Sequence, residues 1–362
     1  MDDKRIINKK LLITGGGTGG HVSPGIAVAQ EWVKQGGKVV FVGTKQGQES
    51  SMVPHAGFDL RCLRISQFKS GGLVKKIMTL IQLPFAVFSA CRIIIKEKPA
   101  LILGTGGYVS GPTCLAGFLM KKPIAIQDQN ARPGITNRFL GRLAQKVFTT
   151  FSQSHAFFNK NKICHTGNPI RAQLKQIPYT THQEILNIFI TGGSQGAVGM
   201  NKLIMEAIDH IKNLWPRLNI THQTAKTDIN EVTDFYKNRS IQADVKSFFN
   251  DMQTHYATAH VVICRAGAST VTELALSGRP AIFIPYPYAA DDHQKKNALA
   301  VTHVEGGWII DQLKDEPKKL AELVEKVYNH PEKLNKKAVN IQKLAKPDAA
   351  KEIVNELGKL VR

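Results

Sequence analysis

The amino-acid sequence predicts an α/β protein made of two doubly wound domains, each with a parallel β-sheet covered by helices. One observation is a repeated opening, because the apolar runs at 11–14 and 188–191 each lead into a glycine-rich turn and then a helix-like stretch. A second observation is that strand-like and helix-like runs alternate after each opening. The third is length, since 362 residues are too many for one typical domain.

The first domain opens with LLIT (11–14), the turn GGGTGGH (15–21) and the helix-like PGIAVAQEWVKQ (24–35). Further β-type runs recur, with helical runs among them, at VVFVG (39–43), ALILG (100–104), PIAIQ (123–127) and KVFTT (146–150). Alternation of this kind is typical of parallel strands, which need long crossover connections, usually helices.

The second domain repeats this order with IFIT (188–191), GGSQGA (192–197) and a helix-like stretch from 198 to 213, followed by β-type runs at 218–222, 260–264 and 280–285. The polar, proline-containing stretch between the two openings predicts a linker. We therefore expect an N-terminal domain at 1–166, a linker at 167–184, a C-terminal domain at 185–340, and at 341–362 a final helix able to pack back on the N-terminal domain.

Composition restricts the classes of partner and compartment. The formal net charge of +20 favours anionic partners such as nucleic acid, acidic lipid or phosphorylated ligands. Five widely spaced cysteines predict reduced thiols, with no disulfide or metal framework. The start of the chain has no signal-peptide pattern, and the longest uncharged apolar stretch, 77–91, is shorter than the roughly 20 residues of a membrane-spanning helix. We expect a cytoplasmic protein that does not cross the membrane.

The two glycine-rich turns suggest phosphate binding. After a parallel strand, such a turn lets backbone amides and a helix N-terminus approach a phosphate closely. Gly15, Gly17 and Gly20 match G-x-G-x-x-G, but the strand at 39–43 is followed by Thr44 instead of the acidic residue of a dinucleotide site. The second turn lacks the Gly-Lys-Ser/Thr of a P-loop. The alternative is that both are simply tight turns.

Seven segments occur in an order that resembles the MurG family of glycosyltransferases. They are GGGTGGHVSPGIAVA (15–29), GTGGYVSGP (104–112), QDQNARPGITNR (127–138), GNPIR (167–171), GGSQGA (192–197), CRAGASTVTELALSGRPAIFIP (264–285) and DDHQKKNA (291–298). The resemblance implies two Rossmann-like domains facing a cleft, the GT-B arrangement, with the sugar nucleotide on the C-terminal domain.

The resemblance also implies an inverting transfer of N-acetylglucosamine from UDP-GlcNAc to the 4-hydroxyl of the muramyl sugar of lipid I, the undecaprenyl-diphospho-muramylpentapeptide, in peptidoglycan synthesis. Expected partners are UDP-GlcNAc, lipid I, anionic phospholipid and other cell-wall synthesis proteins, at the cytoplasmic face of the inner membrane. No tightly bound cofactor and no protein metal site are expected, because no H-E-x-x-H, D-x-D or Cys/His ligand spacing occurs.

His21 is the candidate catalytic base. It follows the first glycine turn, at the carboxyl end of a strand, and imidazole titrates near neutral pH. The alternative is that His21 only orients the acceptor or its diphosphate. The resemblance adds Thr18, Gly19 and Gly20 beside it as donor-binding residues.

Stabilisation of the negative charge on the departing UDP is assigned to the second glycine turn, 192–196, together with Ser194 and the N-terminus of the helix that follows. Arg171 could add a bidentate clamp or instead form a salt bridge at a hinge. Glu273 could accept both ribose hydroxyls or instead cap its helix.

The resemblance alone places the remaining donor-binding residues. Phe249 stands where relatives often have Ile to frame the uracil, and the others are Asn130, Ala268, Ser269, Thr270, Val271, Thr272, Gln294 and Asn297. One departure is clear. Where relatives commonly read His-Glu-Gln-Asn, this chain reads Gln127, Asp128, Gln129, Asn130, so a role that rests on that histidine is in doubt, and Asp128 could support His21 or the acceptor.

The segment from Arg61 to Pro99 carries eight Lys or Arg residues and one acidic residue, Glu97, among apolar side chains. This pattern suits docking on an anionic inner leaflet, although an ordinary pair of core helices split at Pro84 would give it too. Nucleic acid is disfavoured because no DNA-binding signature or aromatic-basic stacking motif occurs.

Three other functions stay open. They are a UDP-GlcNAc 2-epimerase on the same architecture, a non-catalytic nucleotide- or lipid-binding protein, and an NAD oxidoreductase. The segments 104–112 and 127–134 argue against an epimerase because they resemble acceptor-domain segments of the transferase. The presence of His21, Arg171 and Glu273 argues against a non-catalytic role, and the missing ribose acid after 39–43 argues against NAD.

Overall fold

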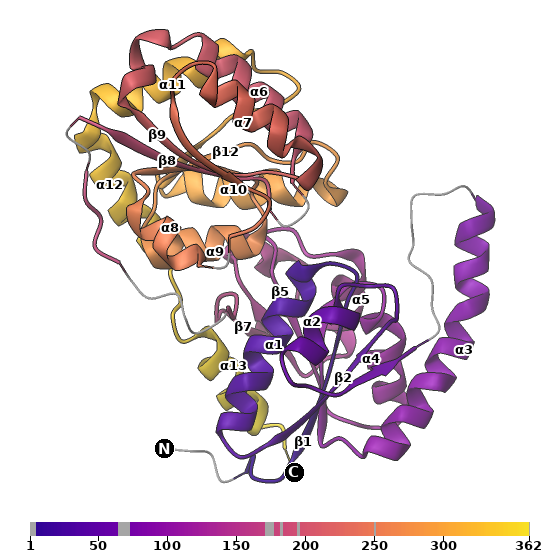
Figure 1. Cartoon of the computed structure of the whole chain (residues 1–362). Helices are drawn as coiled ribbons and strands as arrows, with labels where there is room; N and C mark the ends of the chain where they lie inside the picture. The colour runs from indigo at the N-terminus through magenta and orange to yellow at the C-terminus, as the bar shows by residue number, and fades with distance from the viewer. Residues whose placement is uncertain are drawn as a thin grey trace. The chain divides into compact units, whose positions relative to one another are not determined.

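The computed structural model describes residues 5–63, 73–170, 177–181, 184–193, 196–249 and 251–361 (Figure 1). The chain divides into two compact units. The first unit is Met1–Ala172 with Lys346–Arg362, and the second is Gln173–Ala345. Within the described part of the chain, no helix combines the length and apolar character that crossing a membrane requires.

The described strands of the first unit form one parallel sheet in the order β3-β2-β1-β4-β5-β6-β7. Strand order reverses between β1 and β4, as in a Rossmann-like fold. The strands are β1 (Lys10–Gly15), β2 (Lys38–Gly43), β3 (Leu60–Cys62), β4 (Leu101–Gly106), β5 (Ile124–Asp128), β6 (Lys146–Thr149) and β7 (Ile163–Cys164).

Helices cover both faces of this sheet, as expected for parallel strands with apolar residues on both sides. One face packs under α1 (Gly19–Lys34), α2 (Glu49–His55) and α13 (Ala349–Gly358). The other face packs under α3 (Leu73–Glu97), α4 (Ser110–Leu119) and α5 (Ile135–Leu143). Two 3-10 segments, Ser152–Phe157 and Lys160–Lys162, lie between β6 and β7.

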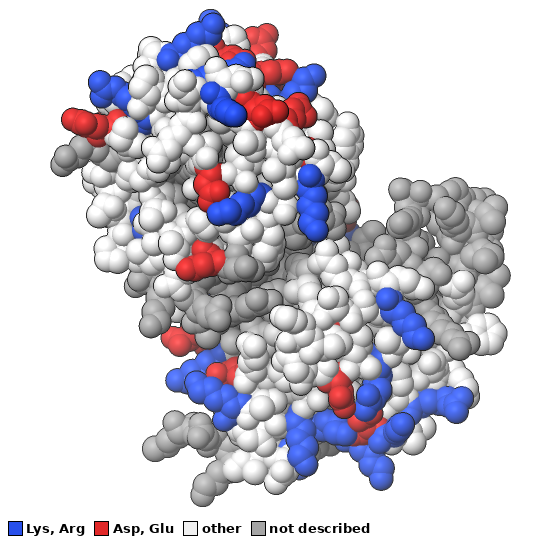
Figure 2. Space-filling view, viewed as in Figure 1, with Lys and Arg blue, Asp and Glu red and all other residues white. Residues whose placement is uncertain are grey.

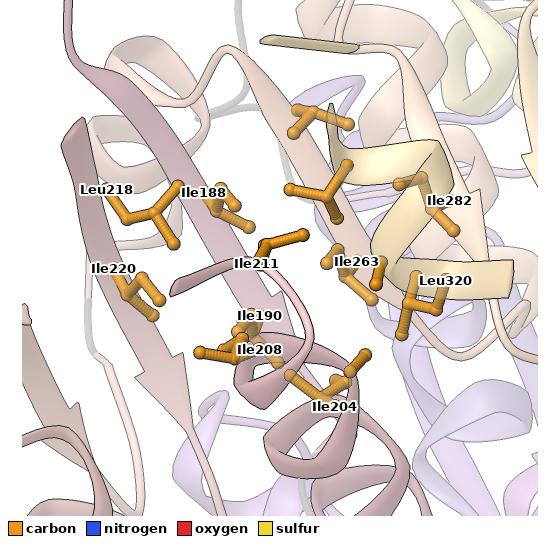
Figure 3. Packing of buried hydrophobic residues seen from close by; sticks show 14 of the residues in the cluster. Ile188, Ile190, Ile204, Ile208, Ile211, Leu218, Ile220, Ile263, Ile282 and Leu320 are labelled. Carbon is orange, nitrogen blue, oxygen red and sulfur yellow. The ribbon is translucent and has the colours of Figure 1, made fainter. Parts of the chain in front are cut away.

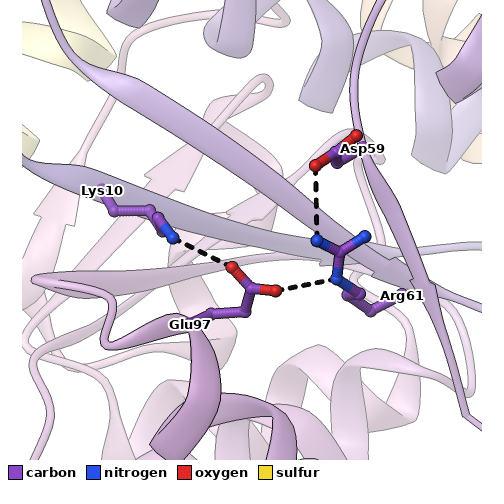
Figure 4. Close-up of polar contacts among 4 residues, drawn as sticks. All are labelled: Lys10, Asp59, Arg61 and Glu97. Atoms are coloured by element: carbon purple, nitrogen blue, oxygen red, sulfur yellow. Dashed lines mark hydrogen bonds and ion pairs between the residues drawn. The ribbon is translucent and has the colours of Figure 1, made fainter.

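An ion-pair cluster fixes the carboxyl end of α3 to the sheet (Figure 4). Glu97, only 8% exposed, accepts from Lys10 Nζ at 2.9 Å and from Arg61 Nε at 2.7 Å. Asp59 lies 3.3 Å from Arg61 on the outer side. The hydrogen bonds from Lys10 and Arg61 hold the pKa of Glu97 below its usual value, so the carboxylate stays charged and paired.

The described strands of the second unit also form a parallel sheet, in the order β10-β9-β8-β11-β12-β13. The order reverses between β8 and β11, so this unit is Rossmann-like too. The strands are β8 (Leu186–Thr191), β9 (Leu218–Gln223), β10 (Gln242–Lys246), β11 (Val261–Cys264), β12 (Ala281–Phe283) and β13 (Gly307–Ile309).

The core of the second unit is aliphatic (Figure 3). Side chains of β8, β9 and β11 meet those of α6 (Val198–Asp209) and α11 (Pro317–Asn329), with Ile190, Ile204 and Leu320 at most 1% exposed. The other helices are α7 (Ile229–Lys237), α8 (Met252–Thr258), α9 (Ala268–Ser277), α10 (His293–His303) and α12 (Pro331–Gln342), with 3-10 segments Lys212–Arg217, Lys226–Asp228 and Ala290–Asp292.

The predicted fold class of two Rossmann-like α/β domains with parallel sheets is confirmed. Two helix boundaries differ from those that the sequence pattern indicates. Helix α1 begins at Gly19, before the helix-like stretch at 24–35, so His21 lies in its first turn. Helix α12 ends at Gln342 within the second unit, and the chain returns to the first unit at Lys346, where α13 packs on α1.

Candidate functional site

The glycine-rich turns after β1 and after β4 contact each other at the point where the strand order of the first sheet reverses. Gly16 N donates to Gly106 O at 3.3 Å, across the ends of β1 and β4. Gly107 has φ +80°, and a Cβ added there would lie 2.2 Å from Gly16 O. Only glycine fits that contact, because the backbone is left-handed and another main chain occupies the space. The segments GGGTGGH and GTGGY therefore form one surface at the carboxyl edge of the sheet.

His21 stands on this surface, half-buried, and its Nδ1 faces two oxygen atoms. Its Nδ1 lies 3.2 Å from Thr105 O and 3.1 Å from Gln129 Oε1, both of which are acceptors. Gln129 presents its oxygen to the ring because its NH2 group donates to Thr105 O at 2.7 Å and to Gln127 Oε1. Nδ1 therefore carries the proton in neutral His21, which leaves the lone pair, and so the basic site, on Nε2.

A chain of buried amides continues behind His21. Gln127 Nε2 donates to Asn168 Oδ1 at 3.2 Å, and Gln127 is 0% exposed. The resemblance led us to expect histidine at position 127, and in this chain a buried amide takes that place. Its side chain faces the protein interior and orients Gln129, instead of facing a substrate.

Asp128, 1% exposed, organises the loop between β5 and α5. Its Oδ1 accepts from Asn130 N at 3.0 Å, and its Oδ2 accepts from Asn137 Nδ2 at 2.8 Å. Burial raises the pKa of the Asp128 carboxyl from 3.8 to about 6, although hydrogen bonds from Asn137, Asn130 and Gly134 oppose the shift. These contacts place Asn130, a predicted donor-binding residue, at the same edge of the sheet, half-buried.

Glu49 is a residue of this site that the sequence patterns did not predict. It is 0% exposed, and its Oε2 accepts from Gly17 N at 2.9 Å. Its Oε1 accepts from Thr44 N at 2.9 Å and from Thr44 Oγ1 at 2.7 Å, while that hydroxyl also lies 3.0 Å from Tyr108 OH. The amide of Gly17 is thus engaged by a protein carboxylate. Thr18 and Gly20, both exposed, and the half-buried Gly19 form the accessible start of α1.

In the second unit, the glycine turn between β8 and α6 is described by the structure at residues 192–193 and 196–197. Gly193 and Gly196 have φ +84° and +71°, and a Cβ at Gly196 would meet Ala225 N at 2.6 Å. The turn therefore requires glycine and passes close to the chain that follows β9. The predicted residues Ser194 and Arg171 lie outside the described residues.

Helix α9 begins directly after the loop that follows β11, so its N-terminal amides lie at the carboxyl edge of the second sheet. Ser269, Thr270 and Glu273 are partly exposed, on one side of the helix. Tyr256 OH donates to Glu273 Oε2 at 2.8 Å. The side chains of Ala268, Val271 and Thr272 are buried, and Thr272 Oγ1 donates back to Ala268 O, so these three can meet a ligand only through their backbone.

Three further predicted donor-binding residues have mainly structural contacts. Asn297 is 0% exposed and donates to Ala266 O at 3.1 Å, which fixes the loop before α9. Gln294, half-buried, accepts from Tyr286 N at 2.9 Å. The Phe249 ring is 4% exposed and packs 4.2 Å from the His255 ring, centroid to centroid, so a base could meet this residue through its backbone but not through its ring.

Comparison with known proteins identifies the family. Models of the glycosyltransferase family 28 N-terminal and C-terminal domains match residues 11–149 and 187–353. A relative from Myxococcus xanthus is 41% identical over 96% of this chain and 91% of its own length, and one from Geobacter metallireducens is 39% identical over 96% and 98%. Both are named UDP-N-acetylglucosamine--N-acetylmuramyl-(pentapeptide) pyrophosphoryl-undecaprenol N-acetylglucosamine transferase.

A crystal structure of MurG from Acinetobacter baumannii is 32% identical and superimposes with a TM-score of 0.82, covering 97% of this chain and 99% of that one. The chain belongs to the MurG family of glycosyltransferases. The resemblance read from the seven sequence segments is confirmed, and so is the GT-B class of fold.

Other solved structures share the fold with the MurG family at low identity. A UDP-GlcNAc 2-epimerase from Neisseria meningitidis, bound to UDP-GlcNAc, is 16% identical with a TM-score of 0.66, and covers 97% of this chain and 100% of that one. At that identity the likeness extends to the fold alone, and it gives the epimerase alternative no support beyond a shared architecture.

The raised pKa of Asp128 implies that the free energy of unfolding depends on pH. A carboxyl whose pKa is higher in the folded state stabilises the fold most below its unfolded pKa, near 3.8, and this contribution is lost as pH rises through about 6. Between pH 4 and pH 7.5 the natural protein should therefore lose about 1–3 kcal/mol of unfolding free energy relative to Asp128→Asn. Urea denaturation at several pH values measures this difference.

The matched control for this experiment is Asp234→Asn, which changes an exposed carboxylate in the second unit. Its stability difference from the natural protein, measured over the same pH range, gives the effect of an Asp-to-Asn change at an exposed position. If the difference for Asp128→Asn varied no more with pH than this control, the raised pKa of Asp128 would be contradicted.

Proposed function

We propose that this chain transfers N-acetylglucosamine from UDP-GlcNAc to the muramyl 4-hydroxyl of undecaprenyl-diphospho-muramylpentapeptide and releases UDP. The observation that carries the proposal is similarity along nearly the whole chain to transferases whose names state this reaction. The surfaces at the carboxyl edges of the two sheets supply the groups that such a reaction needs.

The acceptor side is assigned to the first unit. The attacking hydroxyl forms a bond to the anomeric carbon while the bond from that carbon to UDP breaks, and the hydroxyl proton must be removed. With Nδ1 committed to Thr105 O and Gln129 Oε1, His21 would take that proton at Nε2. Thr18, Gly19 and Gly20, at the accessible start of α1 beside His21, would meet the UDP-GlcNAc donor with their backbone amides.

The donor side is assigned to the second unit. The N-termini of α6 and α9 provide backbone amides and positive helix-dipole ends for the UDP phosphates, and Ser194 and Arg171 would add to them. Glu273 would accept the ribose hydroxyls. These groups can stabilise the negative charge that develops on UDP, so we propose that transfer needs no tightly bound metal.

Membrane docking is assigned to the exposed part of α3. Phe85 and Phe88 are 74% and 66% exposed, and Arg92 and Lys96 are exposed further along the helix. On the face shown in Figure 2, Lys and Arg side chains gather at the lower end of the first unit, around the carboxyl end of α3. Aromatic side chains beside cations suit insertion into an anionic leaflet, at the cytoplasmic face where the acceptor lipid would lie. The part of the basic segment at 64–72 lies outside the described residues.

The transfer reaction can be tested by incubating the protein with UDP-GlcNAc and a soluble lipid I analogue while UDP release and the glycosylated product are measured. His21→Ala should lower kcat by about 10²–10⁴-fold, because general-base catalysis contributes that much, with little change in the KM for UDP-GlcNAc. EDTA treatment should leave the natural protein's rate unchanged.

The control variant is His55→Ala, which removes an exposed imidazole from α2 in the same unit and should keep the natural rate. A normal kcat for His21→Ala at saturating acceptor would leave His21 with an orienting role only. Epimerised UDP-sugar without acceptor glycosylation would refute the transferase itself.

The docking surface predicts sedimentation with vesicles. The natural protein should sediment with phosphatidylglycerol vesicles at low salt and much less with phosphatidylcholine vesicles. The double change Phe85→Ser and Phe88→Ser should lower the partition coefficient at least about tenfold, since burial of each ring is worth roughly 1.5–3 kcal/mol. Phe248→Ser, at an exposed phenylalanine of the second unit, is the matched control. Equal sedimentation of all three proteins would overturn the assignment to α3.

A further inference from the structure

Behind the α9 carboxylate lies a buried tyrosine from a different helix. Tyr256, in α8, is 0% exposed, and its hydroxyl donates to Glu273 Oε2 at 2.8 Å. Glu273 itself is only partly buried, on the exposed side of α9. The hydrogen bond therefore joins the buried Tyr256 hydroxyl to the partly exposed Glu273 carboxylate on α9, the helix that begins at the carboxyl edge of the second sheet.

Aromatic packing fixes the position of the tyrosine hydroxyl. The Tyr256 ring meets the Phe189 ring of β8 edge to face, with centroids 5.6 Å apart, and Phe189 also contacts Phe249 at 6.1 Å. Rings packed in this way have few alternative rotamers. Burial, together with the neighbouring Glu273 charge, raises the pKa of Tyr256 well above its usual value, so the hydroxyl keeps its proton and remains a donor.

We propose that Tyr256 is a positioning residue for the nucleotide: its hydroxyl holds the Glu273 carboxylate in the orientation that accepts both hydroxyls of the ribose. The inference rests on the proposed function, in which Glu273 binds ribose. A carboxylate that accepts two adjacent hydroxyls must keep its plane aligned with both. An untethered carboxylate loses that alignment to side-chain rotation and must regain it when the nucleotide binds.

Tyr256→Phe tests the hydroxyl because the ring and its packing remain. Without the hydroxyl, the Glu273 carboxylate has to be ordered when the nucleotide binds, so the Kd for UDP should rise roughly tenfold. In the transfer assay the KM for UDP-GlcNAc should rise by a similar factor, with kcat changed less than about threefold and Tm close to that of the natural protein. A merely structural tyrosine would lower Tm without this split between KM and kcat.

Comparison of UDP with 2′-deoxy-UDP by calorimetry on the full chain isolates the ribose contact. The natural protein should prefer UDP, Glu273→Gln should lose most of that preference, and Tyr256→Phe should lose part of it. Tyr236→Phe, at another buried tyrosine of the second unit whose hydroxyl pairs with His222, should keep the natural Kd and preference.

Two results would overturn the proposal. One is a Tyr256→Phe protein with the natural Kd, or with equal losses for UDP and 2′-deoxy-UDP. The other is a Glu273→Gln protein that still prefers UDP, since Tyr256 would then have no ribose contact to position. The proposed function is judged separately, because product formation from UDP-GlcNAc and the lipid I analogue by the natural protein does not depend on either preference.

Discussion

The close approach of two main chains at the ends of β1 and β4 is the constraint on which the surface around His21 depends. With no Cβ at Gly107, its backbone can pack against Gly16, which brings the turn after β4 beside the start of α1. Thr105, at the same turn, accepts at its carbonyl from Gln129 and lies within hydrogen-bond distance of the His21 ring. If the two turns were separated, the imidazole would lose the partners that determine which nitrogen holds the proton.

The second unit has a similar strand order, but different side chains lie at the carboxyl edge of its sheet. Its turn after β8 also requires glycine, at Gly196, because the chain after β9 lies against it. The helix after β11 then carries the carboxylate assigned to the ribose, with Tyr256 behind it. The two units thus place helix N-termini at the carboxyl edges of their sheets. The helix in the first unit carries the His21 imidazole, and the helix in the second unit carries the Glu273 carboxylate.

Much of this arrangement could be predicted from the sequence, because strand–turn–helix openings are local patterns and glycine positions reveal close approaches. The same patterns predicted that His21 and Glu273 lie in segments that follow a strand, and the structure places them on α1 after β1 and on α9 after β11. The interior contacts could not be predicted, since Glu49 meets Gly17 across 32 positions of the chain and Tyr256 reaches Glu273 from another helix. Asn297 shows the opposite case, in which a family motif predicts a contact with ligand but the side chain is buried against Ala266 O.

The Glu49 carboxylate has a consequence for how the first turn responds to ligand. Glycine-rich chain is the most flexible kind, and ordering it on contact with a diphosphate would normally subtract from affinity. Here the hydrogen bond from Gly17 to the buried Glu49 side chain, which is itself held by Thr44, restrains that chain. The loss of backbone freedom is thus incurred at folding, and a ligand at this turn would meet a preformed, rigid surface despite the turn's glycine-rich composition.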